Sequence, residues 1–201
     1  MNKENYDLLM QREIDSLQNR KPKLLLHSCC APCSSACLER IKDKFDITVY
    51  FYNPNMDTEE EFNLRKEEQE RICKLLEVKC IISDYNSEEF LSCAKGFENA
   101  TEGGARCQKC FYLRLKTTAQ FAKENGYEYF ATTLTVSPLK NVTLINQIGL
   151  EIEKQLNMKY LPTDFKKRGG YQKSIELSSK HDLYRQNYCG CIFSKIKSRN
   201  Q

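Results

Sequence analysis

The sequence predicts an α/β fold, in which a mostly parallel sheet of about four or five strands is flanked by helices. Short apolar runs alternate at least three times with longer segments whose apolar residues recur at helical spacing. The first apolar run ends in several thiols and then passes into a helical pattern. Such thiols would lie at the carboxyl edge of the sheet, where parallel α/β folds bind their ligands.

Four segments are expected to form strands. The first begins at Lys23 and continues through the run Leu24-Leu25-Leu26, which is too short for the core of a helix. The others are bounded by turn signals, and most are rich in β-branched and aromatic residues. They lie at residues 47–52, 78–82 and 127–134, and a further strand or loop is expected at 160–165.

Helices are expected between the strands. Asp57 or Thr58 is placed to cap the third helix, and Gly126 is placed to end the helix before the fourth strand. We expect helices at residues 3–19, 34–43, 59–77, 88–94, 107–125, 141–155 and 172–180, with a last short helix from near Cys191.

The composition is that of a folded protein, since 40% of the 201 residues are hydrophobic, 29% are charged and the net charge is +4. No apolar run reaches the roughly 18 residues that a membrane-spanning helix needs. Residues 1–19 are polar and not typical of a secretion signal, so we expect a cytoplasmic protein. We expect a single α/β domain over residues 1–201, with an N-terminal helix in 1–20 and a segment at about 162–201 that closes the site.

Cysteine is the outlier, with eleven residues. In a reducing compartment, closely spaced cysteines more often bind metals or perform redox chemistry than form disulfides. Three groups lie where a strand or loop meets the start of a helix, and helix N-termini stabilise thiolates. The groups are Cys29, Cys30 and Cys33; Cys107 and Cys110; and Cys189 and Cys191.

Seven thiols exceed the four ligands of one tetrahedral zinc ion, and they suit an iron–sulfur cluster with a second metal beside it. Two alternatives stay open. A thioredoxin-type dithiol would use Cys30 and Cys33 alone, and a structural zinc ion would use the other two groups. His27 fits either a metal ligand or a hydrogen-bonding neighbour of the site. We expect structural roles for Cys37, Cys73, Cys80 and Cys93.

The second candidate set is basic and aromatic. Cations interleaved with tyrosines can pair with RNA phosphates and stack on unpaired bases, although a solvated basic surface has the same composition. Lys140 follows a turn at a predicted strand end and is a further candidate. The candidate substrate-binding residues are Arg106, Arg114, Lys166, Lys167, Arg168, Gly169, Gly170, Tyr171 and Arg185.

Several enzyme classes are disfavoured. The glycine-rich loops that bind nucleotide phosphates do not occur, and neither does the H-E-x-x-H signature of zinc proteases. With only two histidines in the chain, histidine-centred acid–base catalysis has little support. Reduction at a metal–thiolate centre fits the residues better.

Several motifs resemble those of the QueH-type epoxyqueuosine reductases. They occur in the family's order from about residue 23 to 194, and the closing stretch is the most specific. The motifs are HSCCAPC at 27–33, YNPN at 52–55, EGGARCQKCF at 102–111, SPLK at 137–140, and the stretch from Asp164 through RGGY at 168–171 to YRQNYCGC at 184–191.

This resemblance implies a cytoplasmic enzyme that reduces epoxyqueuosine to queuosine at the wobble position of tRNAs with a GUN anticodon, the last step of queuosine biosynthesis. It implies a Rossmann-like fold of the adenine-nucleotide alpha-hydrolase type. The implied cofactors are a [4Fe–4S] cluster and a neighbouring mononuclear iron, with zinc as the alternative on isolation and without cobalamin. Electrons would come one at a time from an external donor.

The resemblance also implies roles for individual residues. All seven grouped cysteines would bind metal, and Cys33 fits either the cluster or the second metal. We expect Cys33, Tyr188 and Lys140 to take part in catalysis. Lys140, Tyr188 or Tyr171 would supply protons, while a metal with an open position would act as a Lewis acid on the epoxide oxygen.

Overall fold

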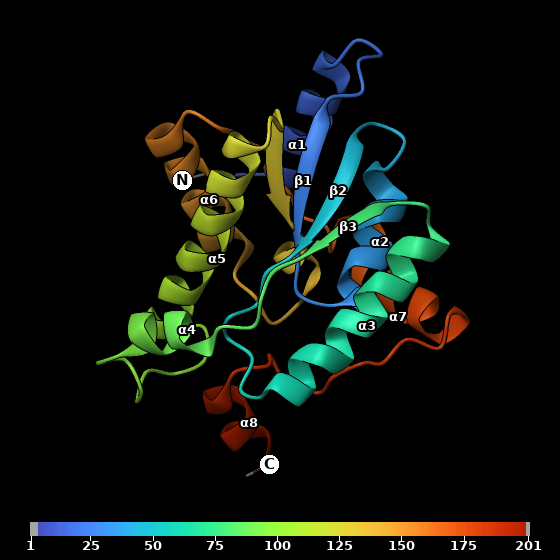
Figure 1. Ribbon diagram of the computed structural model, residues 1–201. Helices are drawn as coiled ribbons and strands as arrows, with labels where there is room; N and C mark the ends of the chain where they lie inside the picture. Colours follow the sequence, from blue (N-terminus) through green and yellow to red (C-terminus); the bar gives the residue numbers. More distant parts are fainter. Residues whose placement is uncertain (1–3, 200–201) are drawn as a thin grey trace.

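The structure is a computed structural model that describes residues 4–199, with side chains described as far as residue 195 (Figure 1). Its centre is a five-stranded sheet in the order β3-β2-β1-β4-β5. Every pairing in this sheet is parallel, so the predicted α/β class is confirmed. The strands are β1 (Lys23–Ser28), β2 (Asp46–Phe51), β3 (Lys79–Ile82), β4 (Tyr129–Thr132) and β5 (Lys159–Tyr160).

Helices cover both faces of the sheet. The α-helices are α1 (Tyr6–Ser16), α2 (Ala31–Ile41), α3 (Glu59–Leu75), α4 (Ser87–Ala94), α5 (Ala105–Glu124), α6 (Val142–Leu156), α7 (Gly170–Lys180) and α8 (Ile192–Arg199). Two short 3-10 helices are η1 (Thr133–Val136) and η2 (Lys167–Gly169). Figure 1 shows α5 and α6 on one side of the sheet, and α2, α3 and α7 on the other. Within the described residues, no helix combines the length and apolar character needed to cross a membrane.

The central strand explains these two layers. Leu24 and Leu26 of β1 belong to the buried cluster that includes Leu38 of α2. Leu25 belongs to the cluster on the other face, which includes Leu115 of α5. Because successive side chains of a strand point to opposite faces, an uninterrupted apolar run is what a strand covered on both sides requires.

Most predicted boundaries are close to the observed ones, and two of them have clear local causes. α3 begins as predicted, because Thr58 Oγ1 accepts a hydrogen bond of 3.2 Å from the backbone N–H of Glu61. α2 begins at Ala31 rather than at Ser34. Pro32 lies in its first turn, where the missing N–H of proline costs no hydrogen bond.

The predicted strand at 127–134 is wrong at both ends. β4 covers only Tyr129–Thr132, and the chain then turns into η1. Thr132 Oγ1 accepts a hydrogen bond of 3.1 Å from the backbone N–H of Leu134, which bends the backbone out of the sheet. β4 therefore ends two residues earlier than predicted, and η1 follows it directly.

The C-terminal segment returns across the carboxyl end of the sheet. α7 packs against α2, and the chain then runs below the strand ends to α8 (Figure 1). Arg71 of α3 fastens this segment, because its two Nη atoms each donate a hydrogen bond of 2.8 Å, one to the carbonyl of His181 and one to that of Asp182. Residues that are distant in the sequence thus meet at one edge.

We expect Gly149→Ala to destabilise the protein by about 1–3 kcal/mol, although alanine normally favours a helix over glycine by about 1 kcal/mol. A Cβ on Gly149 of α6 would lie 2.4 Å from the buried ring of Tyr160. Urea unfolding measures the change. Gln147→Ala, on the exposed side of the same helix, is the control, and equal midpoints for Gly149→Ala and the unaltered protein would contradict the expectation.

Candidate metal centre

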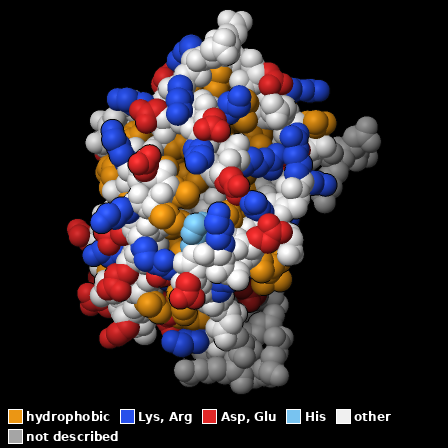
Figure 2. All heavy atoms as spheres, turned by 90° about the vertical axis from the view of Figure 1, so that its right-hand side faces the viewer, with side chains coloured by type: hydrophobic (Ala, Val, Ile, Leu, Met, Phe, Trp, Pro, Cys, Tyr) orange, Lys and Arg blue, Asp and Glu red, His pale blue; other side chains and the backbone are white. Residues whose placement is uncertain are grey.

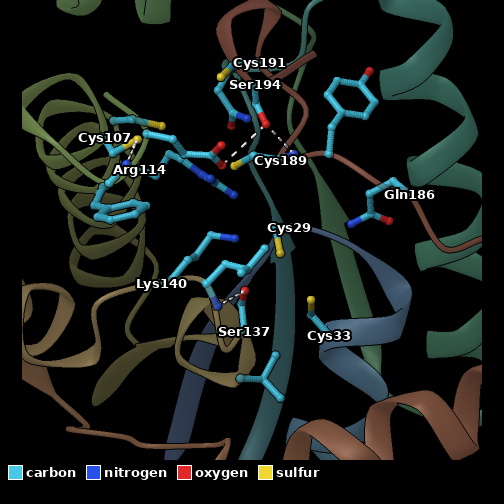
Figure 3. Close-up of a pocket in the computed structure, with 18 of the residues that line it drawn as sticks. Cys29, Cys33, Cys107, Arg114, Ser137, Lys140, Gln186, Cys189, Cys191 and Ser194 are labelled. Atoms are coloured by element: carbon cyan, nitrogen blue, oxygen red, sulfur yellow. Dashed lines mark hydrogen bonds between the residues drawn. The ribbon is translucent and has the colours of Figure 1, made fainter. Parts of the chain in front are cut away.

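A cavity of about 430 Å³ lies at the carboxyl end of the sheet, under the C-terminal segment (Figure 3). All three cysteine groups contribute to it. This is the edge at which parallel α/β sheets bind ligands. The cysteines that line the cavity are Cys29, Cys33, Cys107, Cys110, Cys189 and Cys191, and the Cys30 sulfur lies 3.8 Å from that of Cys29.

The first cysteine group is compact. Cys29 follows β1, Cys30 is the N-cap of α2, and Cys33 lies in the first turn of that helix. Their three sulfurs lie within 4.8 Å of one another, and none of them is in a disulfide. Three soft sulfur donors at this spacing could hold a metal ion or an iron–sulfur cluster.

Contacts among these three thiols make them chemically unequal. Hydrogen bonds with Cys30 and Cys33 hold the pKa of Cys29 well below its usual value, and the positive charge of Lys140 acts in the same direction. Its interaction with Cys29 raises the pKa of Cys30 to about 11. Cys29 is therefore the thiol of this group that ionises most readily.

The second and third groups lie together at another side of the cavity, where Figure 3 shows Cys107, Cys189 and Cys191. Burial raises the pKa of Cys110 to about 12, and burial followed by the charge of Cys189 raises that of Cys191 to about 11. Thiols in this state ionise when a metal ion supplies positive charge. The donor set therefore fits a resident metal group.

Lys140 lines the same cavity and places its ammonium group near these thiols (Figure 3). Burial would lower the pKa of Lys140, but the nearby Cys189, Cys29 and Cys33 together raise it above its usual value. The ammonium group therefore stays protonated inside the cavity. It can offset thiolate charge or donate a proton.

Arg114 and His27 form a buried pair beside the first cysteine group. Arg114 Nε donates to His27 Nε2 at 3.2 Å, and Arg114 Nη2 donates to Asn53 Oδ1 at 2.5 Å. His27 Nδ1 lies 2.8 Å from Thr132 Oγ1. Burial and the Arg114 charge lower the pKa of His27 to about 3, so its ring is neutral and both nitrogens are engaged. This arrangement favours the hydrogen-bonding role of His27 over the ligand role.

A buried network supports the first cysteine group from α3. Ser28 Oγ donates to Gln69 Oε1 at 2.7 Å, and Gln69 Nε2 donates to Ser34 Oγ at 2.9 Å. Ser28 Oγ also lies 3.3 Å from the carbonyl oxygen of Cys30. Gln69 thereby fixes the backbone on both sides of the cysteines.

The four remaining cysteines lie away from the cavity lining. Cys37 and Cys73 are buried in the main core, and Cys80 packs against it. Cys93 packs against a small cluster formed by α4 and its neighbours. The structural roles of these four cysteines stay a prediction, and Cys93 packs beside two cavity cysteines, Cys110 and Cys191.

Besides Cys189 and Cys191, the predicted C-terminal residues that line the cavity are Tyr171, Arg185 and Tyr188. Arg185 Nη1 donates hydrogen bonds of 3.0 Å to the carbonyl of Ser174 and to Ser178 Oγ. The Tyr188 hydroxyl donates to Asp57 Oδ1 at 2.7 Å, and burial together with Asp57 raises its pKa. Tyr188 is therefore held protonated by an internal partner.

The basic stretch just before α7 lies outside the cavity lining. Lys166 Nζ donates to the carbonyl of Lys140 at 3.2 Å, and Arg168 Nε donates to Asp7 Oδ2 at 3.0 Å, which ties η2 to α1. Lys167 is exposed, and Gly169 and Gly170 form the turn into α7. On the face that carries α3 and α7, basic and acidic side chains are interspersed (Figure 2).

Arg106 lines the cavity but is committed to the protein itself. Its Nη1 donates to the carbonyls of Phe97, Glu98 and Ala100 at 2.7–3.0 Å, and its guanidinium stacks 4.2 Å from the ring of Phe193. It therefore fixes the loop before α5. Arg114 is likewise buried and donates its hydrogen bonds within the protein, to His27 and Asn53.

Among the lining residues to which the sequence patterns assigned no role are Arg65, Asn55, Glu102 and Gln186, the last three lying within the quoted motifs. Asn55 stands just after β2, so its place at a strand end could have identified it. Asn55 Oδ1 and Gln186 Oε1 are buried and have no hydrogen-bond partner in the described part of the chain. Each can therefore accept a donor group from a bound molecule.

Comparison with known proteins identifies the family. The family model for "Epoxyqueuosine reductase QueH" matches residues 24–197. The epoxyqueuosine reductase QueH of Staphylococcus epidermidis is 42% identical, over 96% of this chain and 85% of that protein. The QueH protein of Streptococcus pyogenes serotype M1 is 40% identical, over 94% of this chain and 78% of its own length.

Among solved structures, the U34-tRNA thiolase NcsA of Methanococcus maripaludis, determined with its [4Fe–4S] cluster, is similar with a TM-score of 0.55. It is 11% identical, and the match covers 92% of this chain and 67% of that one. This likeness concerns the fold alone, and it agrees with the expected α/β fold whose parallel sheet is flanked by helices. The sequence matches carry the assignment: the chain belongs to the epoxyqueuosine reductase QueH family, a family of oxidoreductases.

Proposed function

We propose that the chain reduces epoxyqueuosine to queuosine at the wobble position of tRNAs with a GUN anticodon, the last step of queuosine biosynthesis. The observation that carries this proposal is the convergence of three cysteine groups, distant in sequence, on one cavity. The reductase name shared by the relatives supplies the reaction and the substrate. The chain would act in the cytoplasm as a single domain.

The proposed cofactors are a [4Fe–4S] cluster and a neighbouring iron, or zinc, without cobalamin. Seven thiols in or beside a cavity of about 430 Å³ suit this pair. When bound, they supply electrons from an external donor and a Lewis acid for the epoxide oxygen. The segment at about 162–201 closes the site through Tyr171, Arg185 and the third cysteine group.

The proposed reaction needs two electrons and two protons. Both C–O bonds of the epoxide break, a C=C bond forms, and the oxygen leaves as water. The protein must therefore bind the modified base, orient the epoxide and deliver protons inside a cavity from which bulk water is displaced.

Lys140 is the proton donor that the geometry supports best. It lines the cavity and keeps its proton because Cys29 and Cys33 stabilise its charge, while burial opposes this. Tyr188 lines the same cavity, but its hydroxyl is engaged by Asp57. Cys33 stays a candidate for a direct catalytic role, since it is the half-buried member of the first group.

Protein purified without oxygen and reconstituted with iron and sulfide should be brown, and with a reductant it should convert epoxyqueuosine in tRNA to queuosine. Mass spectrometry of the tRNA nucleosides measures the product. A colourless protein that carries zinc without iron would instead indicate a zinc module that only binds RNA. A brown, iron-loaded protein that forms no queuosine would count against the proposed reaction.

Cys29→Ala should reduce metal retention by more than the roughly 10–100-fold that loss of an outer-shell partner costs. The reason is that Cys29 is the thiol of its group that ionises most readily. Iron and sulfide content measures the effect. Cys37→Ala, which removes a buried thiol within α2 that does not line the cavity, is the matched control and should keep its metal.

The same assay separates the dithiol alternative. A thioredoxin-type enzyme would depend on Cys30 and Cys33 and would keep its activity in Cys107→Ala. We expect Cys107→Ala to lose both metal and queuosine formation, and full activity in this variant would overturn the metal assignment.

Neutralising Lys167 should weaken tRNA binding and lower the salt slope by about 0.7–0.9, the value for one phosphate contact. Lys167 is exposed, whereas Arg168 is occupied by Asp7. Arg168→Gln should therefore have a smaller effect on the slope than Lys167→Gln. Affinity measured over a salt series tests this, and identical slopes for Lys167→Gln and the unaltered protein would remove Lys167 from the proposed footprint.

A further inference from the structure

Arg65 of α3 is a buried cation at the cavity. It is only 1% exposed and lines the cavity together with Cys29 and Cys189. Burying a charged side chain is costly unless partners compensate for the lost water. The groups that contact the Arg65 guanidinium therefore indicate why a cation is buried here.

The guanidinium of Arg65 packs against the third cysteine group. Its Nη1 donates to the carbonyl of Cys189 at 3.4 Å, and the Tyr188 ring lies 5.4 Å away. A Cβ on Gly190, which has a φ of +110°, would come within 3.2 Å of Nη1 and 3.3 Å of Nη2. The Cys189-Gly190-Cys191 turn thus packs directly against the Arg65 guanidinium, with little room for a side chain at Gly190.

The ion pair of Arg65 leaves part of its bonding capacity unused. Glu61 Oε1 accepts a hydrogen bond of 2.7 Å from Nε and lies 2.6 Å from Nη2. Nη2 carries two N–H groups, of which this ion pair can occupy one, and no other described residue accepts a hydrogen bond from it. A buried N–H donor without an acceptor suits a sulfur ligand or sulfide of a group bound in the cavity.

Charge connects Arg65 with the first cysteine group as well. Burial would lower the pKa of Arg65, but Cys30 and then Glu61 raise it above its usual value. Arg65 also lines the cavity together with Cys29 and Cys33, so it places a permanent positive charge, shielded from bulk water, near the first group as well as the third.

We propose that Arg65 is a positioning residue of the metal centre, which holds the Cys189–Cys191 turn beside the first cysteine group and raises the reduction potential of the bound iron–sulfur group. This inference rests on the proposed cofactor. A reduced group carries one more negative charge than an oxidised one. A fixed cation therefore stabilises the reduced form, and hydrogen bonds to sulfur act in the same direction.

The test compares reduction potentials of protein reconstituted with iron and sulfide, in the absence of tRNA. Arg65→Met should shift the reduction equilibrium at least about tenfold toward the oxidised form, a fall of about 59 mV for one electron. Arg65→Lys keeps the charge and should stay within about threefold of the unaltered protein. Arg71→Met is the matched control. Arg71 lies on the same helix and also bonds the C-terminal segment, but it does so at a place outside the cavity lining.

Every outcome of this comparison either supports or contradicts the proposed role of Arg65. An iron-loaded Arg65→Met protein with an unchanged potential would overturn the inference, and so would an equal fall in Arg71→Met. If Arg65→Met takes up no iron, Arg65→Lys decides: a retained potential supports the inference, whereas a tenfold shift or failure to load overturns it. Failure of the unaltered protein to load would remove the proposed cofactor and this inference with it.

Discussion

The structure depends on keeping ionisable sulfur and positive charge together in one enclosed place. Burial raises the pKa of Cys110 and Cys191, whereas contacts within the first group lower that of Cys29. Lys140 and Arg114 supply cations to the same cavity. The buried cations depend on ionisable thiols nearby, because an isolated buried charge is expensive. Together they form a polar interior that could hold a metal ion or an iron–sulfur cluster.

The backbone brings this chemistry together from three distant segments. The parallel sheet places the ends of β1 and β4 at one edge, and α5 begins beside them. The third group comes from the tail, which is fastened where the N–H of Asp57 donates to the carbonyl of Gly190 at 2.9 Å. All three cysteine groups are therefore together only when the tail is docked, so binding of the proposed metal group and docking of the tail should stabilise each other.

The cysteines and the layered fold were predictable from the sequence because each depends on local pattern. Apolar runs buried on both faces, thiols at helix starts and the Thr58 cap all leave such a pattern. The role of Arg65 leaves no such pattern in the sequence, because α3 is rich in charged residues and resembles a solvent-exposed helix. The end of β4 depends on one hydroxyl of Thr132, which composition does not reveal. The role of Arg65 depends on contacts with residues that are distant in the sequence, and the end of β4 depends on one specific hydrogen bond; neither can be inferred from local composition.

Several basic side chains are bonded to groups of the protein itself, which limits how many of them could contact RNA phosphates. Arg168 is bound to Asp7, Arg106 to backbone carbonyls and Lys166 to the carbonyl of Lys140. A net charge of +4 leaves little cation in excess for phosphates. Binding that relied on phosphates alone would be weak and would not distinguish RNA sequences. Selectivity should therefore come from the cavity, where the free acceptors of Asn55 and Gln186 can read the modified base itself.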